Sequence, residues 1–292
     1  MARDNSGTLA TRGHSNSIVK VPQEHITTVD GIKTHYFESG PDTQGHVLFI
    51  HGLGSSADRW LDIPLALSFH YHTLAIDLPG FGLSDKPSPG GAMEYTIQDF
   101  ARFVVQFLRS LGFEDRRTTL VGHSLGGYIA AEVAVQNREL VDKLVLVDTS
   151  GMLDGPTPLL KQYLAAALNP TRQTVRPVLE QLVANPVRIP DALVDGFIYR
   201  LGLQGAREAF VAAYDNSVST QLGKQRLEQI ASKTLLIWGS QDKLIPLEPY
   251  CNIFHQSIRD SRLVVIDDAG HAPFSEKPAV FCEVVKQFLR HS

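Results

Sequence analysis

Gly122-His123-Ser124-Leu125-Gly126 fits a G-x-S-x-G pattern at the junction of two predicted elements. The residues before it, 118–121, are a short apolar run that predicts a strand, and residues 125–135 predict a helix. Ser124 is then expected on a sharp strand-to-helix turn that exposes its hydroxyl. Glycines at both ends of the motif leave room where strand and helix pack closely. The stretch therefore predicts a nucleophilic serine.

Short apolar runs recur along the chain and alternate with longer segments of helical periodicity. This alternation is typical of strands and helices that take turns around a mostly parallel sheet. We expect eight strands, at 25–29, 34–38, 47–50, 73–76, 118–121, 143–147, 234–238 and 262–266. The first two flank Asp30-Gly31, which favours the tight turn of a hairpin, and we place this hairpin at the edge of the sheet. The sequence thus predicts an α/β fold with helices on both faces of the sheet.

Two helices carry clear signals of their own. Thr96-Ile97-Gln98-Asp99 predicts an N-terminal capping box ahead of an apolar stripe that ends at Leu111. Pro278 suits a first helical turn, and the apolar stripe that follows it runs to Leu289. We interpret both stripes as surfaces that pack on the core.

The rhythm of strands stops between residues 151 and 224. Helical segments there are interrupted by prolines, and no strand is predicted. We therefore predict an α/β core at 21–150 and 225–292, with a helical cap inserted at 151–224. The alternative is that 151–224 is simply a helical part of the same core. Residues 1–20, rich in Ser, Thr, Gly and Asn, are expected to form a disordered arm.

Composition excludes several classes of protein. The chain has 292 residues, 43% of them hydrophobic and 20% charged, with a formal net charge of -4, as is ordinary for a globular protein. Its 27 Lys and Arg residues are scattered, so we expect no nucleic-acid partner. No run approaches the roughly 18 to 20 apolar residues of a transmembrane helix. Residues 1–20 contain no apolar run that could serve as the core of a signal peptide. We also expect no disulfide framework from the two cysteines, Cys251 and Cys282. These two observations together predict a cytoplasmic location.

A serine nucleophile needs a base, and His271 is the best candidate among eleven histidines. It follows the predicted strand 262–266 after a short polar loop, which places it at the sheet edge where Ser124 is expected. His123 is a neighbour of the serine, but its position on the turn is expected to point it elsewhere. The chain order and location therefore predict that His271 is the general base.

Asp242 is the expected partner of His271. It follows the predicted strand 234–238, and the order Ser124, Asp242, His271 is one in which such triads occur. Asp148, just after the strand 143–147, is the competing candidate because it would reach the same edge. Asp267 and Asp268 lie too close to His271 along the loop to be preferred.

Acyl transfer also needs donors for the developing oxyanion, usually two backbone amides. His51-Gly52-Leu53-Gly54 follows the strand 47–50 and contains small residues that let amides face a pocket. We predict the backbone amides of Leu53 and Leu125 as these donors. The alternative is that the segment is merely a glycine-bearing turn.

Five motifs in the same order resemble the α/β-hydrolase superfamily. They are His51-Gly52-Leu53-Gly54, Asp77-Leu78-Pro79-Gly80-Phe81-Gly82-Leu83-Ser84, Gly122-His123-Ser124-Leu125-Gly126-Gly127, Trp238-Gly239-Ser240-Gln241-Asp242 and Gly270-His271. The resemblance covers most of the chain outside the arm and the cap. It implies the α/β-hydrolase fold and the Ser124, Asp242, His271 triad, but one scaffold hosts many chemistries.

Serine at the nucleophile position departs from the haloalkane dehalogenases and epoxide hydrolases, which use aspartate. Gly-His-Ser-Leu-Gly is more similar to esterases and lipases, so we expect a carboxylic ester as the small-molecule substrate, with apolar groups against the cap. The cap's leucines, Phe197, Tyr199, Phe210 and Tyr214 are candidates for that pocket, although we expect most of them to be part of the ordinary core of the cap.

Three alternatives stay open. The cap is similar in length to that of hydrolases that cleave carbon–carbon bonds in ring-opened aromatic catabolites, and Arg188, Arg200 or Arg207 would suit an acidic substrate. A lactonase and a hydrolase-like ligand receptor are the others. The expected chemistry requires no metal and no organic cofactor.

Overall fold

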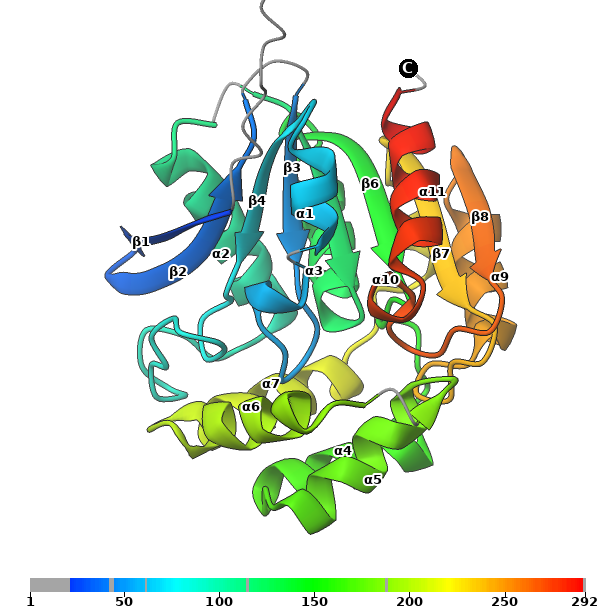
Figure 1. Ribbon diagram of the computed structural model, residues 1–292. Coiled ribbons are helices and arrows are strands. Elements are labelled where there is room, and N and C mark those ends of the chain that lie inside the picture. The colour runs from blue at the N-terminus through cyan, green and yellow to red at the C-terminus, as the bar shows by residue number, and fades with distance from the viewer. Residues whose placement is uncertain (1–21, 42–44, 61, 114–115, 187–188, 291–292) are drawn as a thin grey trace, which may run out of the picture.

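An eight-stranded sheet forms the centre of the computed structural model, which describes residues 22–41, 45–60, 62–113, 116–186 and 189–290 (Figure 1). The strand order is β1-β2-β4-β3-β5-β6-β7-β8. The bounds are β1 Gln23–Val29, β2 Ile32–Ser39, β3 His46–Ile50, β4 His72–Ile76, β5 Thr118–His123, β6 Val141–Val147, β7 Lys233–Gly239 and β8 Ser261–Ile266. All eight predicted strands are confirmed, and the expected arm at 1–20 lies outside the described residues.

The sheet is parallel except at one edge. β1 pairs antiparallel with β2, β2 pairs antiparallel with β4, and every pair from β4 to β8 is parallel. Asp30 and Gly31 both have positive φ angles, 49° and 81°, as the predicted hairpin turn requires. Every residue of β3, β4 and β5 is buried, which explains why these strands are apolar runs rather than alternating patterns.

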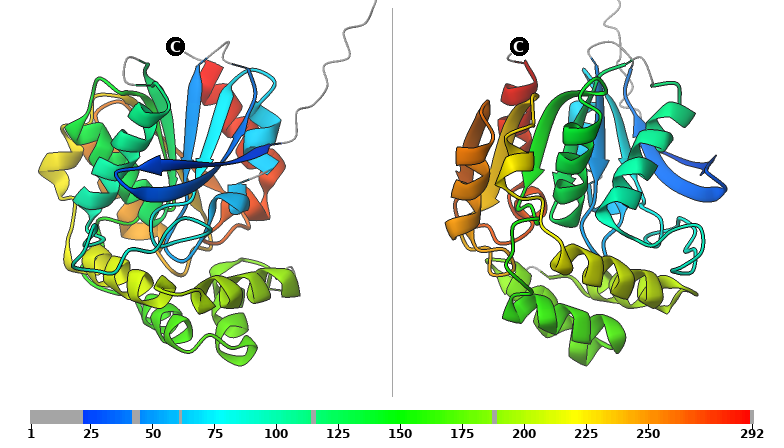
Figure 2. Two further views of the ribbon diagram at one scale, coloured as in Figure 1. Left: turned by 90° about the vertical axis from the view of Figure 1, so that its left-hand side faces the viewer. Right: turned by 180° about the vertical axis from the view of Figure 1, so that it is seen from behind.

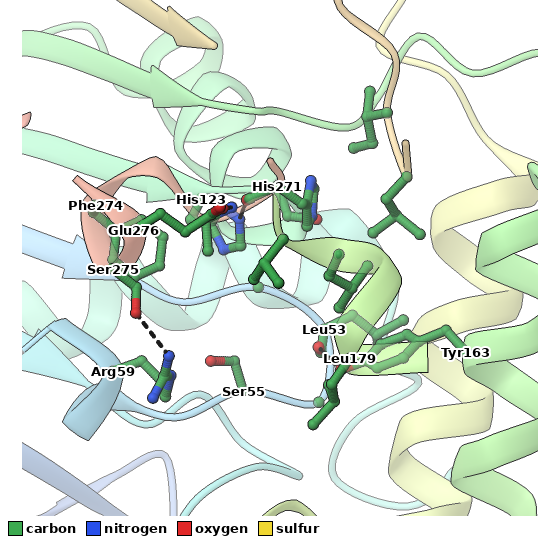
Figure 3. Close-up of a pocket in the computed structure, with 18 of the residues that line it drawn as sticks. Leu53, Ser55, Arg59, His123, Tyr163, Leu179, His271, Phe274, Ser275 and Glu276 are labelled. Atoms are coloured by element: carbon green, nitrogen blue, oxygen red, sulfur yellow. Dashed lines mark hydrogen bonds between the residues drawn. The ribbon is translucent and has the colours of Figure 1, made fainter. Parts of the chain in front are cut away.

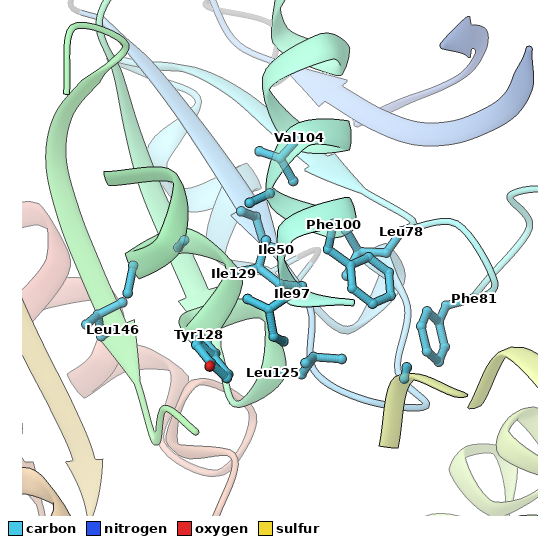
Figure 4. Close-up of a cluster of buried hydrophobic side chains, with 14 of the residues drawn as sticks. Ile50, Leu78, Phe81, Ile97, Phe100, Val104, Leu125, Tyr128, Ile129 and Leu146 are labelled. Carbon is cyan, nitrogen blue, oxygen red and sulfur yellow. The ribbon is translucent and has the colours of Figure 1, made fainter. Parts of the chain in front are cut away.

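Helices cover both faces of the sheet, as predicted. α1 (Asp62–Leu67) and α11 (Pro278–Arg290) lie on one face, in front in Figure 1. α2 (Ile97–Ser110), α3 (Leu125–Gln136), α8 (Lys224–Leu227) and α9 (Leu247–Ser257) lie on the other. Figure 4 shows Phe100 and Val104 of α2 gathered with Ile129 of α3 in this second layer of core. The Thr96 capping box of α2 is confirmed, since Thr96 Oγ1 accepts from Asp99 N at 3.0 Å.

Four helices lie together beyond the carboxyl ends of the parallel strands, at the bottom of Figure 1 and in both views of Figure 2. They are α4 (Pro158–Leu168), α5 (Arg172–Leu182), α6 (Asp191–Gly202) and α7 (Ala206–Ser219), and they connect β6 to β7. No strand occurs in the described part of 151–224. We call α4 to α7 the cap helices; the division of the chain into domains at 151 and 224 stays a prediction.

Two further expectations concern cysteines and membranes. Cys251 in α9 and Cys282 in α11 are both buried, free thiols. Within the ranges that the structure describes, no helix combines the length and the apolar character that crossing a bilayer demands.

Candidate active site

Ser124 lies on the turn that joins β5 to α3, with φ 53° and ψ −118°, a backbone conformation that is strained for a side-chain-bearing residue. Its amide donates to Val147 O at 2.9 Å, and its carbonyl accepts from Gly127 N at 3.0 Å. A Cβ at Gly122 would lie 2.2 Å from Gly126 O, and a Cβ at Gly126 would lie 2.2 Å from Ile50 O. The turn can therefore form only because both glycines lack a side chain, as expected from the sequence.

His271 and Asp242 meet at the same edge of the sheet. His271 Nδ1 lies 2.8 Å from Asp242 Oδ2, and both side chains are buried. The other carboxylate oxygen of Asp242 accepts from Leu244 N at 2.8 Å and Ile245 N at 3.0 Å. These bonds orient the carboxylate, which in turn fixes the histidine ring so that Nε2 is its free nitrogen.

Ser124 and His271 line one cavity. Within the described chain no hydrogen bond joins Ser124 Oγ to the His271 ring, and such bonds commonly tighten only when substrate is bound. The structure thus places the three predicted residues around one site, and their catalytic roles remain predictions.

Asp148, the competing carboxylate, lies close to both Asp242 and His271, but among the described residues the hydrogen bond to His271 Nδ1 comes from Asp242 and not from Asp148. Its Oδ1 accepts from Gly239 N at 2.9 Å, and its Oδ2 is buried without a partner among the described residues. Burial raises the pKa of Asp148 well above its usual range, and the negative charge of Asp242 raises it further. These two effects favour the protonated form of Asp148 over the charged form.

Asp148, Asp242 and His271 each offer a ligand atom within 4.8 Å of the others, a spacing that metal sites also show. His271 Nδ1 and Asp242 Oδ2 are hydrogen-bonded to each other, however, and Asp242 Oδ1 accepts from two backbone amides. The atoms of Asp242 and His271 therefore fit a hydrogen-bonded pair better than a metal centre.

His123 has a position that the sequence did not predict. Its side chain lines the cavity, and its Nε2 donates to the backbone carbonyl of His271 at 2.6 Å. Burial lowers the pKa of His123 well below its usual value, and the neighbouring His271 lowers it further, so the ring is neutral. The residue beside the predicted nucleophile thus holds the backbone of the predicted base.

Leu53 and Leu125, the predicted oxyanion donors, both line the cavity. Neither backbone amide donates a hydrogen bond within the described residues. The loop of Leu53 packs tightly on the turn, since a Cβ at Gly52 would lie 3.0 Å from Ser124 Cβ. Both amides, on segments next to Ser124, are therefore available as donors to an oxyanion.

Side-chain hydrogen bonds hold the loop that carries Leu53. His51 Nδ1 donates to Gly52 O at 2.8 Å, and His51 Nε2 accepts from Leu78 N at 3.1 Å. From the cap helices, Tyr163 Oη donates to Leu53 O at 3.0 Å. Core and cap helices therefore both position this loop.

The cavity measures about 680 Å³ and lies between the core loops and the cap helices (Figure 3). The cap side of its wall is mainly apolar, from residues that include Leu160, Leu179, Leu182, Leu193 and Phe197. Its size and apolar wall are typical of small-molecule sites.

Of the aromatic residues proposed for this pocket, Phe197 lines it. Tyr199 is instead exposed, while Phe210 and Tyr214 are buried within the cap helices and do not contribute to the wall. Among the arginines, Arg200 lines the cavity and Arg207 does not; Arg188 lies outside the described residues.

Comparison with known proteins identifies the family. Residues 45–278 match the family described as alpha/beta hydrolase fold, which is most of the chain. The chain belongs to the α/β-hydrolase family. The eight-stranded sheet and the expected superfamily resemblance are thereby confirmed.

Relatives of this α/β hydrolase differ in their chemistry. The chain is 31% identical to the dihydrolipoyllysine-residue acetyltransferase component of the acetoin cleaving system of Cupriavidus necator, covering 89% of this chain and 67% of that protein. It is 28% identical to the 2-hydroxy-6-oxo-6-(2'-aminophenyl)hexa-2,4-dienoic acid hydrolase of Metapseudomonas resinovorans, over 91% of this chain and 90% of that protein. The crystal structure of a membrane phospholipase A superposes on this chain with a TM-score of 0.80 at 26% identity. The match covers 94% of this chain and 88% of the phospholipase chain.

Proposed function

We propose that this α/β hydrolase is a serine hydrolase that cleaves a carboxylic ester through an acyl-enzyme. The observation that carries the proposal is the pair of unengaged amides, at Leu53 and Leu125, in the cavity that Ser124 lines from its strained turn. Donors fixed in this way stabilise the oxyanion of a tetrahedral intermediate. His271, with Nδ1 on Asp242, is the base that activates the serine.

The proposed reaction has two halves. His271 Nε2 takes the proton of Ser124 as the hydroxyl attacks the ester carbonyl, and the alcohol then leaves with that proton. Water repeats the sequence on the acyl-enzyme and releases the acid. Asp242 remains ionised and holds the ring. The apolar cap wall accommodates the acyl or alcohol group.

Hydrolysis of a carbon–carbon bond is the second candidate. It is favoured by the 28% identity to a dienoic acid hydrolase over nearly the whole length of both chains. Both candidates use the same serine, so the substrate must distinguish them.

The test is hydrolysis of a chain-length series of nitrophenyl esters beside a ring-opened dienoate. Wild type is compared with Ser124→Ala and with Ser232→Ala, a matched control that removes another buried serine hydroxyl outside the cavity. We expect rapid ester turnover that falls by about 10³-fold or more in Ser124→Ala and is unchanged in Ser232→Ala. Preference for the dienoate would replace the ester proposal with carbon–carbon cleavage, and near-normal activity of Ser124→Ala would refute both.

A further inference from the structure

Two arginines line the active-site cavity without a part in the proposed mechanism. Arg59 belongs to η1 (Ala57–Trp60), in the segment after β3, and Arg200 belongs to α6. Figure 3 shows Arg59 near Ser55 on the core side of the cavity, joined to Ser275 by a hydrogen bond. Core and cap helices thus each contribute one of these two guanidinium groups to the wall.

Arg59 lacks an acidic partner. Its guanidinium offers five N–H donors, and Nη2 donates to the neutral Ser275 Oγ at 3.0 Å. Among the described residues, no carboxylate oxygen lies within 4.0 Å of this guanidinium. Burial lowers the pKa of Arg59; Asp58 opposes this effect, and the positive charge of Arg200 adds to it. An arginine stays charged in such a place, so Arg59 is a partly desolvated cation with unused donors.

Arg200 is only weakly paired. Its Nη1 lies 3.7 Å from Asp58 Oδ2, at the long end of the range for an ion pair, and the Asp58 side chain is 47% exposed. Its Nε is buried without a hydrogen-bond partner in the described part of the chain. A buried donor without an acceptor is unfavourable, and an acceptor from a ligand would relieve it.

The acidic groups in the cavity wall are engaged elsewhere. Glu276 Oε1 accepts from Gly270 N at 2.9 Å, and Glu276 Oε2 accepts from Ala184 N at 2.8 Å. Asp268 Oδ1 accepts from Gln241 Nε2 at 3.3 Å. Neither carboxylate forms an ion pair with Arg59 or Arg200, so the charge of the two arginines is left for a ligand.

We propose that Arg59 and Arg200 bind a carboxylate of the substrate, so that the enzyme acts on acyl compounds that carry a free acid group besides the scissile ester. A planar guanidinium matches a carboxylate through paired N–H donors. The single negative charge of Asp58 leaves the two arginines with one net positive charge, which suits a monoanion. This inference rests on the proposed function, because it assumes that the same cavity holds the reacting ester.

The first test compares nitrophenyl hemi-esters of succinate, glutarate and adipate with neutral nitrophenyl esters of matched length. We expect wild type to prefer at least one hemi-ester. Arg59→Gln should lower kcat/KM for that hemi-ester by about 10- to 100-fold, mainly through KM, and change neutral esters by less than about twofold. Arg200→Gln should act in the same direction. The control is Arg109→Gln, an exposed arginine of α2, which should change neither.

A second test separates this inference from the proposed chemistry. Ser124→Ala protein is titrated calorimetrically with monomethyl glutarate and with neutral dimethyl glutarate. Tighter binding of the monoanion, lost on adding Arg59→Gln, supports the subsite even if wild type hydrolyses no ester. Equal binding of the two compounds, or a preference that survives both arginine substitutions, overturns it.

Folding defects are controlled with Arg59→Lys. Lysine keeps the charge but loses the paired donors, so the preference for the hemi-ester should fall between those of wild type and Arg59→Gln. If both Arg59→Lys and Arg59→Gln lose as much activity on neutral esters as on the hemi-ester, Arg59 only supports the fold, and the inference is overturned.

Discussion

The ring of His123 donates from Nε2 to the backbone carbonyl of His271 at 2.6 Å, and the two rings lie 4.7 Å apart between centroids. The residue that precedes the predicted nucleophile therefore anchors the loop of the predicted base. This contact spans residues far apart in sequence and ties the β5–α3 turn to the loop after β8.

Replacement of His123 by phenylalanine is expected to lower kcat by about 10-fold, because the His271 carbonyl loses its donor and the base is less well fixed. His123→Gln, which keeps a donor, should recover part of the loss. Steady-state kinetics on the best ester measures both. Equal activities of the two variants would show that the hydrogen bond does not position His271.

Asp242→Asn and Asp148→Asn are expected to differ sharply. Asp242→Asn removes the charge beside His271 and should lower kcat by about 10³- to 10⁴-fold. Asp148→Asn introduces a neutral amide whose oxygen can still accept from Gly239 N, and the raised pKa of Asp148 already favours a neutral side chain there, so kcat should change by less than about threefold. Steady-state kinetics at neutral pH measures kcat for both variants. A large loss of kcat in Asp148→Asn with little loss in Asp242→Asn would show that Asp148, and not Asp242, is the partner of His271.

The raised pKa of Asp148 is also expected to make the free energy of unfolding depend on pH. Burial and the Asp242 charge raise the pKa of Asp148, so between the unfolded and folded pKa values the folded chain holds a proton that the unfolded chain has lost. The stability contributed by Asp148 therefore falls as pH rises through that window. Asp148→Asn has no such proton, so its Tm relative to wild type should rise by a few degrees from about pH 5 to about pH 8. Parallel Tm curves would contradict the raised pKa.

Glycine at 126 is expected to be essential for stability, whereas glycine at 202 is not. A Cβ at Gly126 would lie 2.2 Å from Ile50 O and 2.5 Å from His51 O, which are backbone atoms that cannot move freely. Gly126→Ala should cost about 3 kcal/mol or more. Gly202, in α6, has nothing within 4 Å of such a Cβ, so Gly202→Ala should be neutral or stabilise by up to about 1 kcal/mol. Chemical denaturation of both variants measures the contrast.

Local sequence signals predicted the fold well because each one has a local physical cause. The apolar runs of buried parallel strands, the Asp30-Gly31 turn and the Thr96 capping box all depend on neighbouring residues. The strand ends were less accurate, since polar residues such as His46 and His72 extend β3 and β4 by one residue each beyond the apolar run.

The site was predicted less completely, because some of its features depend on contacts between distant segments. Chain order was enough to place Asp242 by His271, but the raised pKa of Asp148 results from burial and from the packing of β6 beside β7. Arg59 has no motif of its own, and only the packing of η1 brings it to the cavity. Phe210 and Tyr214 lie in the interior of the cap helices, as was expected for most of the candidates, but helical periodicity could not tell which of them, such as Phe197, would reach the cavity wall.

The hydrogen bond from Tyr163 to Leu53 O has a consequence for protein engineering. Its donor belongs to the helices that would be randomised to change selectivity, while its acceptor belongs to the loop proposed to stabilise the transition state. Libraries in α4 that vary Tyr163 would therefore mix changes in selectivity with changes in rate. A library that keeps this tyrosine and varies apolar wall positions such as Leu160 and Leu179 would allow the two properties to evolve separately.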